Sequence, residues 1–196
     1  MNTPNKLTVA RMIACPFFMA AMAIEFPYHY LVALVLFALA AITDAIDGNM
    51  ARKHNLVTNF GKFLDPLADK MLTTSAFIGF IMWKDISAHA VWVCFIVLFR
   101  EFLVSSIRLV LVTSDGKVVA ANIWGKSKTM AQMVGIVVSL GLYSLLYDFK
   151  LADIKPDIVP YANIAIIVIL WIGAVLCVIS GAIYLWDARS YIDPKK

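Results

Sequence analysis

Long apolar runs constrain this chain more than any other feature of its sequence. They cover residues 7–24, 30–52, 61–83, 88–112, 126–147 and 159–187, and polar connections separate them. A helix needs about 20 residues to cross the hydrocarbon core of a bilayer. Strands of a membrane barrel alternate between apolar and polar residues, which these runs do not. The sequence therefore predicts an all-α integral membrane protein with six transmembrane helices in a single domain, residues 1–196.

The composition excludes an ordinary water-soluble domain. Hydrophobic residues make up 62% of the chain and charged residues only 15%, with a mean hydropathy of +0.82. Soluble domains have about 45–50% apolar and about 25% charged residues. The net charge of +4 does not indicate nucleic-acid binding, because the basic residues gather at the ends of the apolar runs. Cys15, Cys94 and Cys177 lie inside apolar runs without metal-ligand spacing, so we expect reduced, buried thiols.

The distribution of Lys and Arg predicts the orientation in the membrane. The N-terminus, the second and fourth connections and the C-terminus are rich in these residues, and the other three connections are poorer. Basic connections stay on the cytoplasmic side. Both termini are therefore expected to be cytoplasmic.

Four aspartates interrupt the apolar pattern where two successive runs meet. Asp44 and Asp47 lie near the end of the second run, and Asp65 and Asp69 lie near the start of the third. Each pair shares one helix face, and the short connection is expected to make the two helices antiparallel neighbours. Four carboxylates in one pocket would repel unless hard divalent cations bound them. The spacing predicts a site for Mg²⁺ or Mn²⁺, with two metal ions as in other phosphoryl-transfer sites.

Small residues and one arginine accompany the aspartates. Gly48, Ala51 and Gly61 would let a neighbouring helix or a flat ligand approach the backbone closely. Arg52 offers a planar guanidinium suited to a pyrophosphate. The alternative interpretation is that the aspartates form structural ion pairs with the basic residues nearby.

The whole pattern resembles the signature of the CDP-alcohol phosphatidyltransferase family, whose members are six-helix membrane enzymes. The residues that carry the resemblance are Asp44, Asp47, Gly48, Ala51, Arg52, Gly61, Asp65 and Asp69. Further segments resemble the bacterial members that make phosphatidylglycerophosphate, namely residues 5–8 with Arg11, 58–62, 100–101 with Arg108, and 125–129. The resemblance covers most of the chain and is weakest in residues 113–124 and in the sixth run.

The resemblance implies a role for each aspartate. Asp44, Asp47 and Asp65 would bind metal and position the CDP group. Asp69 would bind metal and act as the general base. This division is physically reasonable, because the acceptor hydroxyl must lose a proton as it attacks phosphorus, and the base must be ionised and within hydrogen-bond reach.

The smaller residues of the signature would surround the CDP group. The resemblance implies that Gly48, Ala51 and Gly61 leave room for the cytidine and that Arg52 contacts the diphosphate. The implied CDP-binding set is Asp44, Asp47, Gly48, Ala51, Arg52, Gly61 and Asp65.

Four basic residues indicate the chemistry of the acceptor. Arg100, Arg108, Lys126 and Lys128 lie in the fourth and fifth runs, with Arg100 deeper than the others. An acceptor that carries a phosphate monoester needs such a cationic pocket, whereas a neutral acceptor does not. The alternative interpretation of the two lysines is that they anchor helix ends at the membrane surface. Glu101 is expected to pair with a neighbouring basic residue.

The main hypothesis is an enzyme that transfers the phosphatidyl group from CDP-diacylglycerol to glycerol 3-phosphate and releases CMP. The resemblance further implies a homodimer in the bacterial inner membrane. The distribution of Lys and Arg predicts that the active site faces the cytoplasm. One alternative keeps the fold but uses another acceptor, as in cardiolipin, phosphatidylserine or phosphatidylinositol phosphate synthesis. A cation transporter is disfavoured because the acidic residues gather at one end of the helices. A catalytically inactive scaffold is disfavoured because it would not need all four aspartates.

Overall fold

The computed structural model describes residues 3–53, 59–115 and 123–189, and all regular secondary structure within these ranges is helical. The helices are α1 (Thr3–Ala23), α2 (His29–Lys53), α3 (Asn59–Ile81), α4 (Ser87–Asp115), α5 (Ile123–Tyr143), the π-helical turn η1 (Ser144–Asp148), α6 (Leu151–Ile154) and α7 (Ile158–Ala188).

Each predicted apolar run overlaps one long helix over most of its length, and the short helix α6 was not predicted. Four helical segments within the described ranges are long and apolar enough to cross a membrane, and α2 has a shorter apolar stretch, His29–Asp44. The four are Asn5–Ala23, Ser87–Leu111, Ile123–Asp148 and Ile158–Ala188. The chain therefore has the make-up of a multi-pass membrane protein. The count of six spans stays a prediction, because α3 carries charged residues along its first turns.

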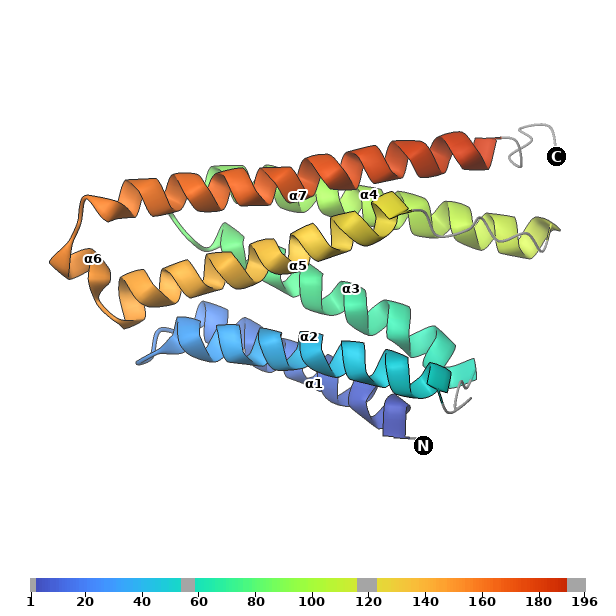
Figure 1. Cartoon of the computed structure of the whole chain (residues 1–196), viewed down its shortest axis with the longest axis horizontal. Coiled ribbons are helices and arrows are strands. Elements are labelled where there is room, and N and C mark those ends of the chain that lie inside the picture. Colours follow the sequence, from blue (N-terminus) through green and yellow to red (C-terminus); the bar gives the residue numbers. More distant parts are fainter. Residues whose placement is uncertain (1–2, 54–58, 116–122, 190–196) are drawn as a thin grey trace.

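The helices form two groups that meet in the middle of the bundle (Figure 1). In the first group α1 packs against both α2 and α3, and in the second α7 packs against α4 and α5. Contacts of α3 with α4 and of α2 with α5 join the groups. The sequence predicted α2 and α3 to be direct neighbours, but the main contact of each is with α1, and the contact between them is small.

The start of α1 and the end of α7 lie at the same end of the bundle, and α6 lies at the other (Figure 1). The last turns of α2 and α4 and the first turns of α3 and α5 also reach the former end. The fold thus brings the predicted aspartates of α2 and α3 to the same end as the predicted basic residues of α4 and α5.

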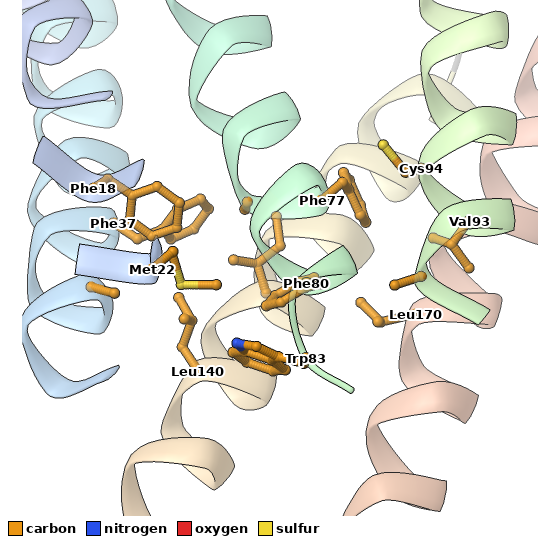
Figure 2. Packing of buried hydrophobic residues seen from close by; sticks show 14 of the residues in the cluster. Phe18, Met22, Phe37, Phe77, Phe80, Trp83, Val93, Cys94, Leu140 and Leu170 are labelled. Atoms are coloured by element: carbon orange, nitrogen blue, oxygen red, sulfur yellow. The ribbon is translucent and has the colours of Figure 1, made fainter. Parts of the chain in front are cut away.

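The apolar core fills the middle of the bundle and extends toward the α6 end. Phe18, Phe37 and Phe80, from α1, α2 and α3, are fully buried against one another's helices (Figure 2). Beyond them Trp83 stacks on Tyr143 of α5 with ring centroids 3.5 Å apart and planes 9° apart. Such aromatic pairs combine a large apolar area with a preferred geometry, so this pair fixes how the segment after α3 sits against α5.

Small residues allow α5 and α7 to approach closely. A Cβ at Gly135 would lie 3.1 Å from Cγ2 of Ile169, and one at Gly173 would lie 3.5 Å from Cγ of Gln132. Close approach of this kind is the usual packing mode of membrane helices, where lipid removes most of the hydrophobic drive between helices. The expectation of unpaired cysteines is confirmed, because all three are buried and free.

Candidate active site

A cavity of about 700 Å³ lies between α2, α3, α4, α5 and α7. Its lining residues come from the end of the bundle where α1 starts and α7 ends, and we call this the cavity end. The opposite end, which carries α6, is called the α6 end. Among the described residues, five basic and three acidic side chains line the cavity, so charged groups gather at this end of an apolar bundle.

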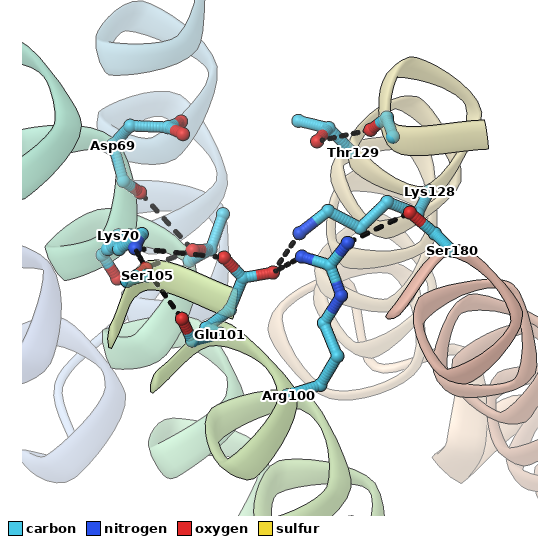
Figure 3. Close-up of polar contacts among 10 residues, drawn as sticks. Asp69, Lys70, Arg100, Glu101, Ser105, Lys128, Thr129 and Ser180 are labelled. Atoms are coloured by element: carbon cyan, nitrogen blue, oxygen red, sulfur yellow. Dashed lines mark hydrogen bonds and ion pairs between the residues drawn. The ribbon is translucent and has the colours of Figure 1, made fainter. Parts of the chain in front are cut away.

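Two of the four predicted aspartates line this cavity. Asp44 enters it from α2 and Asp69 from α3. Asp44 is ion-paired with the buried Arg11 of α1, which fixes the last apolar turns of α2 against α1. Asp69 makes no ion pair within the described part of the chain. Its carboxylate points toward the space between α3 and the segment of α5 that holds Thr129 (Figure 3).

The other predicted residues of the signature fall on the same two helices. Their backbone is helical, and their side chains lie outside the described part of the structure; they are Asp47, Gly48, Ala51, Arg52, Gly61 and Asp65. The described side chains include no group of three or more His, Cys, Asp and Glu residues that could hold a metal ion. The metal site of four carboxylates thus stays a prediction. The structure describes the side chains of two of its aspartates, Asp44 and Asp69.

All four predicted acceptor-binding residues line the cavity, opposite the aspartates. Arg100 and Arg108 come from one face of α4, and Lys126 and Lys128 come from the first turns of α5. They fall into two classes by exposure. Arg100 and Lys128 are buried, with 9% and 8% of their surface exposed, whereas Arg108 and Lys126 are exposed. A buried cation needs a partner, and an exposed one does not.

The buried cations find their partner in Glu101 (Figure 3). Arg100 Nη1 donates to Glu101 Oε1 over 3.0 Å, and Lys128 Nζ pairs with the same oxygen. Lys70 Nζ lies 4.0 Å from Glu101 Oε2 and also donates to the hydroxyl of Ser105. The prediction that Glu101 pairs with a neighbouring basic residue is confirmed, but Glu101 pairs with three basic residues and not with one. One carboxylate joins cations from α3, α4 and α5.

Helix α7 completes the wall around Arg100. Arg100 Nη2 donates to Ser180 Oγ over 2.8 Å. The next residue, Gly181, leaves room for the arginine stem, since a Cβ there would lie only 2.9 Å from Arg100 Cγ. One turn further on, the ring of Tyr184 lies 5.8 Å from Arg108 Cζ, within the range of a cation–π contact.

The family model for CDP-alcohol phosphatidyltransferase matches residues 1–186. The chain belongs to the CDP-alcohol phosphatidyltransferase family.

Three relatives within the family share one name. The chain is 40% identical to the CDP-diacylglycerol–glycerol-3-phosphate 3-phosphatidyltransferase of Bacillus subtilis (strain 168), covering 95% of this chain and 96% of that protein. It is 36% identical to the protein of the same name from Rickettsia bellii (strain RML369-C), covering 97% of each. It is 32% identical to that of Haemophilus influenzae, covering 96% of this chain and 94% of that protein. The predicted resemblance to this family is therefore confirmed over nearly the whole chain.

Sequence reasoning missed several residues that line the cavity of this family member. Lys70 was considered only as a possible ion-pair partner of the aspartates, and Ser105 was not considered. The α7 residues Ser180 and Tyr184 lay in the run where the resemblance was weakest. A signal was available. Ser180 and Tyr184 are polar residues four positions apart in a long apolar run, so they share one helix face, and polar residues in such runs usually face the protein interior.

Proposed function

We propose that this chain transfers the phosphatidyl group from CDP-diacylglycerol to glycerol 3-phosphate, giving phosphatidylglycerophosphate and CMP. The observation that carries the proposal is one cavity in which two signature aspartates face four basic side chains. Relatives that cover nearly the full length are named for this reaction. This acceptor requires both groups of residues. A carboxylate is needed to accept the proton of its hydroxyl, and basic side chains are needed to bind its phosphate.

The charge balance of the acceptor wall favours a phosphate monoester. On the α4 and α5 side, Arg100, Arg108, Lys126 and Lys128 face one acidic residue, Glu101. A phosphate monoester carries nearly two negative charges at neutral pH, and charge-assisted hydrogen bonds to Arg and Lys are the strong ones. A neutral or zwitterionic acceptor would leave this positive surplus unbalanced.

The transfer step assigns a role to Asp69. The primary hydroxyl of the acceptor attacks the phosphorus next to diacylglycerol, and the new P–O bond forms as the bond to CMP breaks. CMP leaves with the electron pair of that bond, and the hydroxyl proton passes to the Asp69 carboxylate. Asp69 suits a general base because it lines the cavity and has no ion-pair partner among the described residues that would compete for its oxygens.

The described aspartates also fit a divalent cation. Both offer carboxylate oxygens, which Mg²⁺ and Mn²⁺ prefer, and Asp69 lines the cavity without an ion-pair partner in the described part of the chain. Asp44, Asp47, Asp65 and Asp69 would together hold two such ions. Bound there, the ions would neutralise charge on the diphosphate and lower the pKa of a hydroxyl near them.

We further infer that the cavity faces the cytoplasm of a bacterial inner membrane. The start of α1 and the end of α7 lie at the cavity end (Figure 1), and the distribution of basic residues assigns the termini to the cytoplasm. This side also suits the reaction, because a phosphorylated small-molecule acceptor must come from the aqueous phase. By family resemblance we infer that the chain acts as a homodimer.

The test is release of CMP by the purified protein in detergent. CDP-diacylglycerol would be supplied with Mg²⁺ or Mn²⁺, and glycerol 3-phosphate, serine, inositol phosphate or phosphatidylglycerol would be offered in parallel. We expect CMP only with glycerol 3-phosphate, and none after EDTA treatment until metal is restored. Release with another acceptor would keep the family chemistry and refute the assignment of glycerol 3-phosphate. Metal-dependent ion flux in liposomes without CMP release would refute the enzyme.

A further inference from the structure

Glu101 lies where four helices converge on the cavity (Figure 3). Its own helix is α4, and its carboxylate pairs with Lys128 of α5 and approaches Lys70 of α3. Through Arg100 it is linked to Ser180 of α7. With 20% of its side-chain surface exposed, Glu101 is largely removed from water, as are the Arg100 and Lys128 side chains at 10% each.

Without this carboxylate the two buried cations would not stay where they are. Like charges close together in a poorly solvated site repel, and removing one partner of a buried ion pair leaves an uncompensated charge. A lysine released in this way turns its ammonium group toward water, because its long stem allows it to snorkel. Arg100 is more constrained, since Ser180 holds one guanidinium nitrogen and Gly181 accommodates its stem.

The four basic residues therefore differ in their relation to the acceptor. Arg108 and Lys126 are exposed and make no ion pair with any residue in the described ranges. They are ready to bind an anion. Arg100 and Lys128 already share Glu101, whose single charge offsets only part of theirs. Lys128 has two further N–H donors, so it can bind an anion while it keeps its carboxylate partner.

We propose that Glu101 is a positioning residue for the acceptor: it holds Arg100 and Lys128 in the cavity wall so that the acceptor's phosphate meets prearranged cations. Prearrangement matters because the energy for ordering long basic side chains is then supplied on folding and not on binding. The inference rests on the proposed function, because it concerns the same cavity, and it extends that function to Glu101, which acts through Arg100 and Lys128.

The first test is Glu101→Gln, which keeps the shape and removes the charge. We expect the KM for glycerol 3-phosphate to rise by about tenfold or more, while the KM for CDP-diacylglycerol changes little. Glycerol 3-phosphate should also raise the melting temperature of the unmodified protein, and this shift should be lost in the variant. Glu25→Gln, the same substitution at an exposed site on the α6 end, is the matched control and should behave as the unmodified protein.

The second test displaces Arg100 without removing a charge. In Gly181→Ala the new methyl group would meet the Arg100 stem, so the guanidinium must shift. We expect the KM for glycerol 3-phosphate to rise by about fivefold or more, because small displacements of positioned groups are costly. Gly141→Ala is the matched control, since a Cβ at Gly141 has no atom within 4 Å, and it should leave both KM values unchanged.

The outcomes separate this inference from the proposed function. If the unmodified protein releases no CMP with glycerol 3-phosphate, the proposed function fails and the inference fails with it. If it does release CMP but both variants keep the original acceptor KM, Glu101 is not a positioning residue and the function stands. An equal loss of kcat with both KM values unchanged would mean a purely structural role and overturn the inference. Should Glu101→Gln fail to fold, the Gly181→Ala measurement decides.

Discussion

The two ends of the helix bundle use similar residue types for different purposes. At the α6 end, polar side chains bind the protein itself: Asp148 Oδ2 accepts from the backbone N–H of Leu31 over 2.7 Å, and Tyr147 donates to Asp85 over 3.2 Å. At the cavity end, five basic residues face three acidic ones in the described lining. At the α6 end these polar groups pair with one another, whereas a surplus of positive charge leaves the cavity end able to take up an anion.

This contrast also separates stability from function. The buried aromatic rings of the core extend to the α6 end, where Trp83 is 3% exposed and Tyr30 packs against the Trp83 ring at 5.7 Å. The cavity end has fewer such contacts, and buried charges take their place. We therefore expect substitutions at the α6 end to lower stability and substitutions at the cavity end to change kinetics. Each of the following predictions tests this division.

The largest effect is expected from Asp69→Asn at the cavity end. The amide can neither accept the acceptor's proton at neutral pH nor bind a divalent cation as well as a carboxylate. CMP release should fall by about a hundredfold or more, because a general base alone contributes about 10²–10⁴. Asp153→Asn, on an exposed turn of the α6 end, is the control. Full activity of Asp69→Asn would mean that Asp69 is neither base nor metal ligand.

At the α6 end the largest effect is expected from Trp83→Ala, and it should be a loss of stability. The substitution removes a buried ring that stacks on Tyr143 and leaves a cavity, so we expect a loss of about 3–5 kcal/mol. The measurement is thermal or denaturant unfolding in detergent, followed by circular dichroism. The fraction that stays folded should keep the KM of both substrates, and a changed acceptor KM would show that the two ends are coupled.

A smaller effect is expected from Arg108→Gln at the cavity end. Loss of one charge-assisted contact to phosphate should raise the KM for glycerol 3-phosphate by about tenfold to a hundredfold. The KM for CDP-diacylglycerol and the melting temperature should hardly change, because Arg108 is exposed. Arg189→Gln serves as control. Arg189 follows the end of α7, where its guanidinium lies over the Trp186 ring, and it does not line the cavity. If both variants raised the acceptor KM equally, a general surface potential and not a defined contact would be responsible.

The smallest effect is expected from Asp148→Ala at the α6 end. Asp148 accepts a hydrogen bond from the backbone N–H of Leu31 in the first turn of α2, as a helix-capping side chain does. Its removal should lower the free energy of unfolding by about 1 kcal/mol. Kinetic constants should remain as in the unmodified protein, and a loss of CMP release comparable to that of Asp69→Asn would refute the division between the ends.

The sequence determined the class of fold and the family by itself. Bilayer thickness and the need to satisfy backbone hydrogen bonds restrict long apolar runs to helices, so the six long helices lie where predicted. The signature residues are close in sequence, with Asp44 and Asp69 on two successive helices, so their grouping needs little tertiary information. The residues proposed to bind the acceptor could also be chosen, because charged side chains in apolar runs are rare.

Only the tertiary structure decided how these groups are arranged. Hydropathy carries no information on which helices touch, and so α1 was not expected to make the main contact with both α2 and α3. The partition of the basic residues into buried and exposed pairs depends on α7, whose Ser180 and Gly181 are some 80 residues from Arg100. Contacts between residues that far apart follow from the packing of complete helices, and local sequence patterns do not encode them.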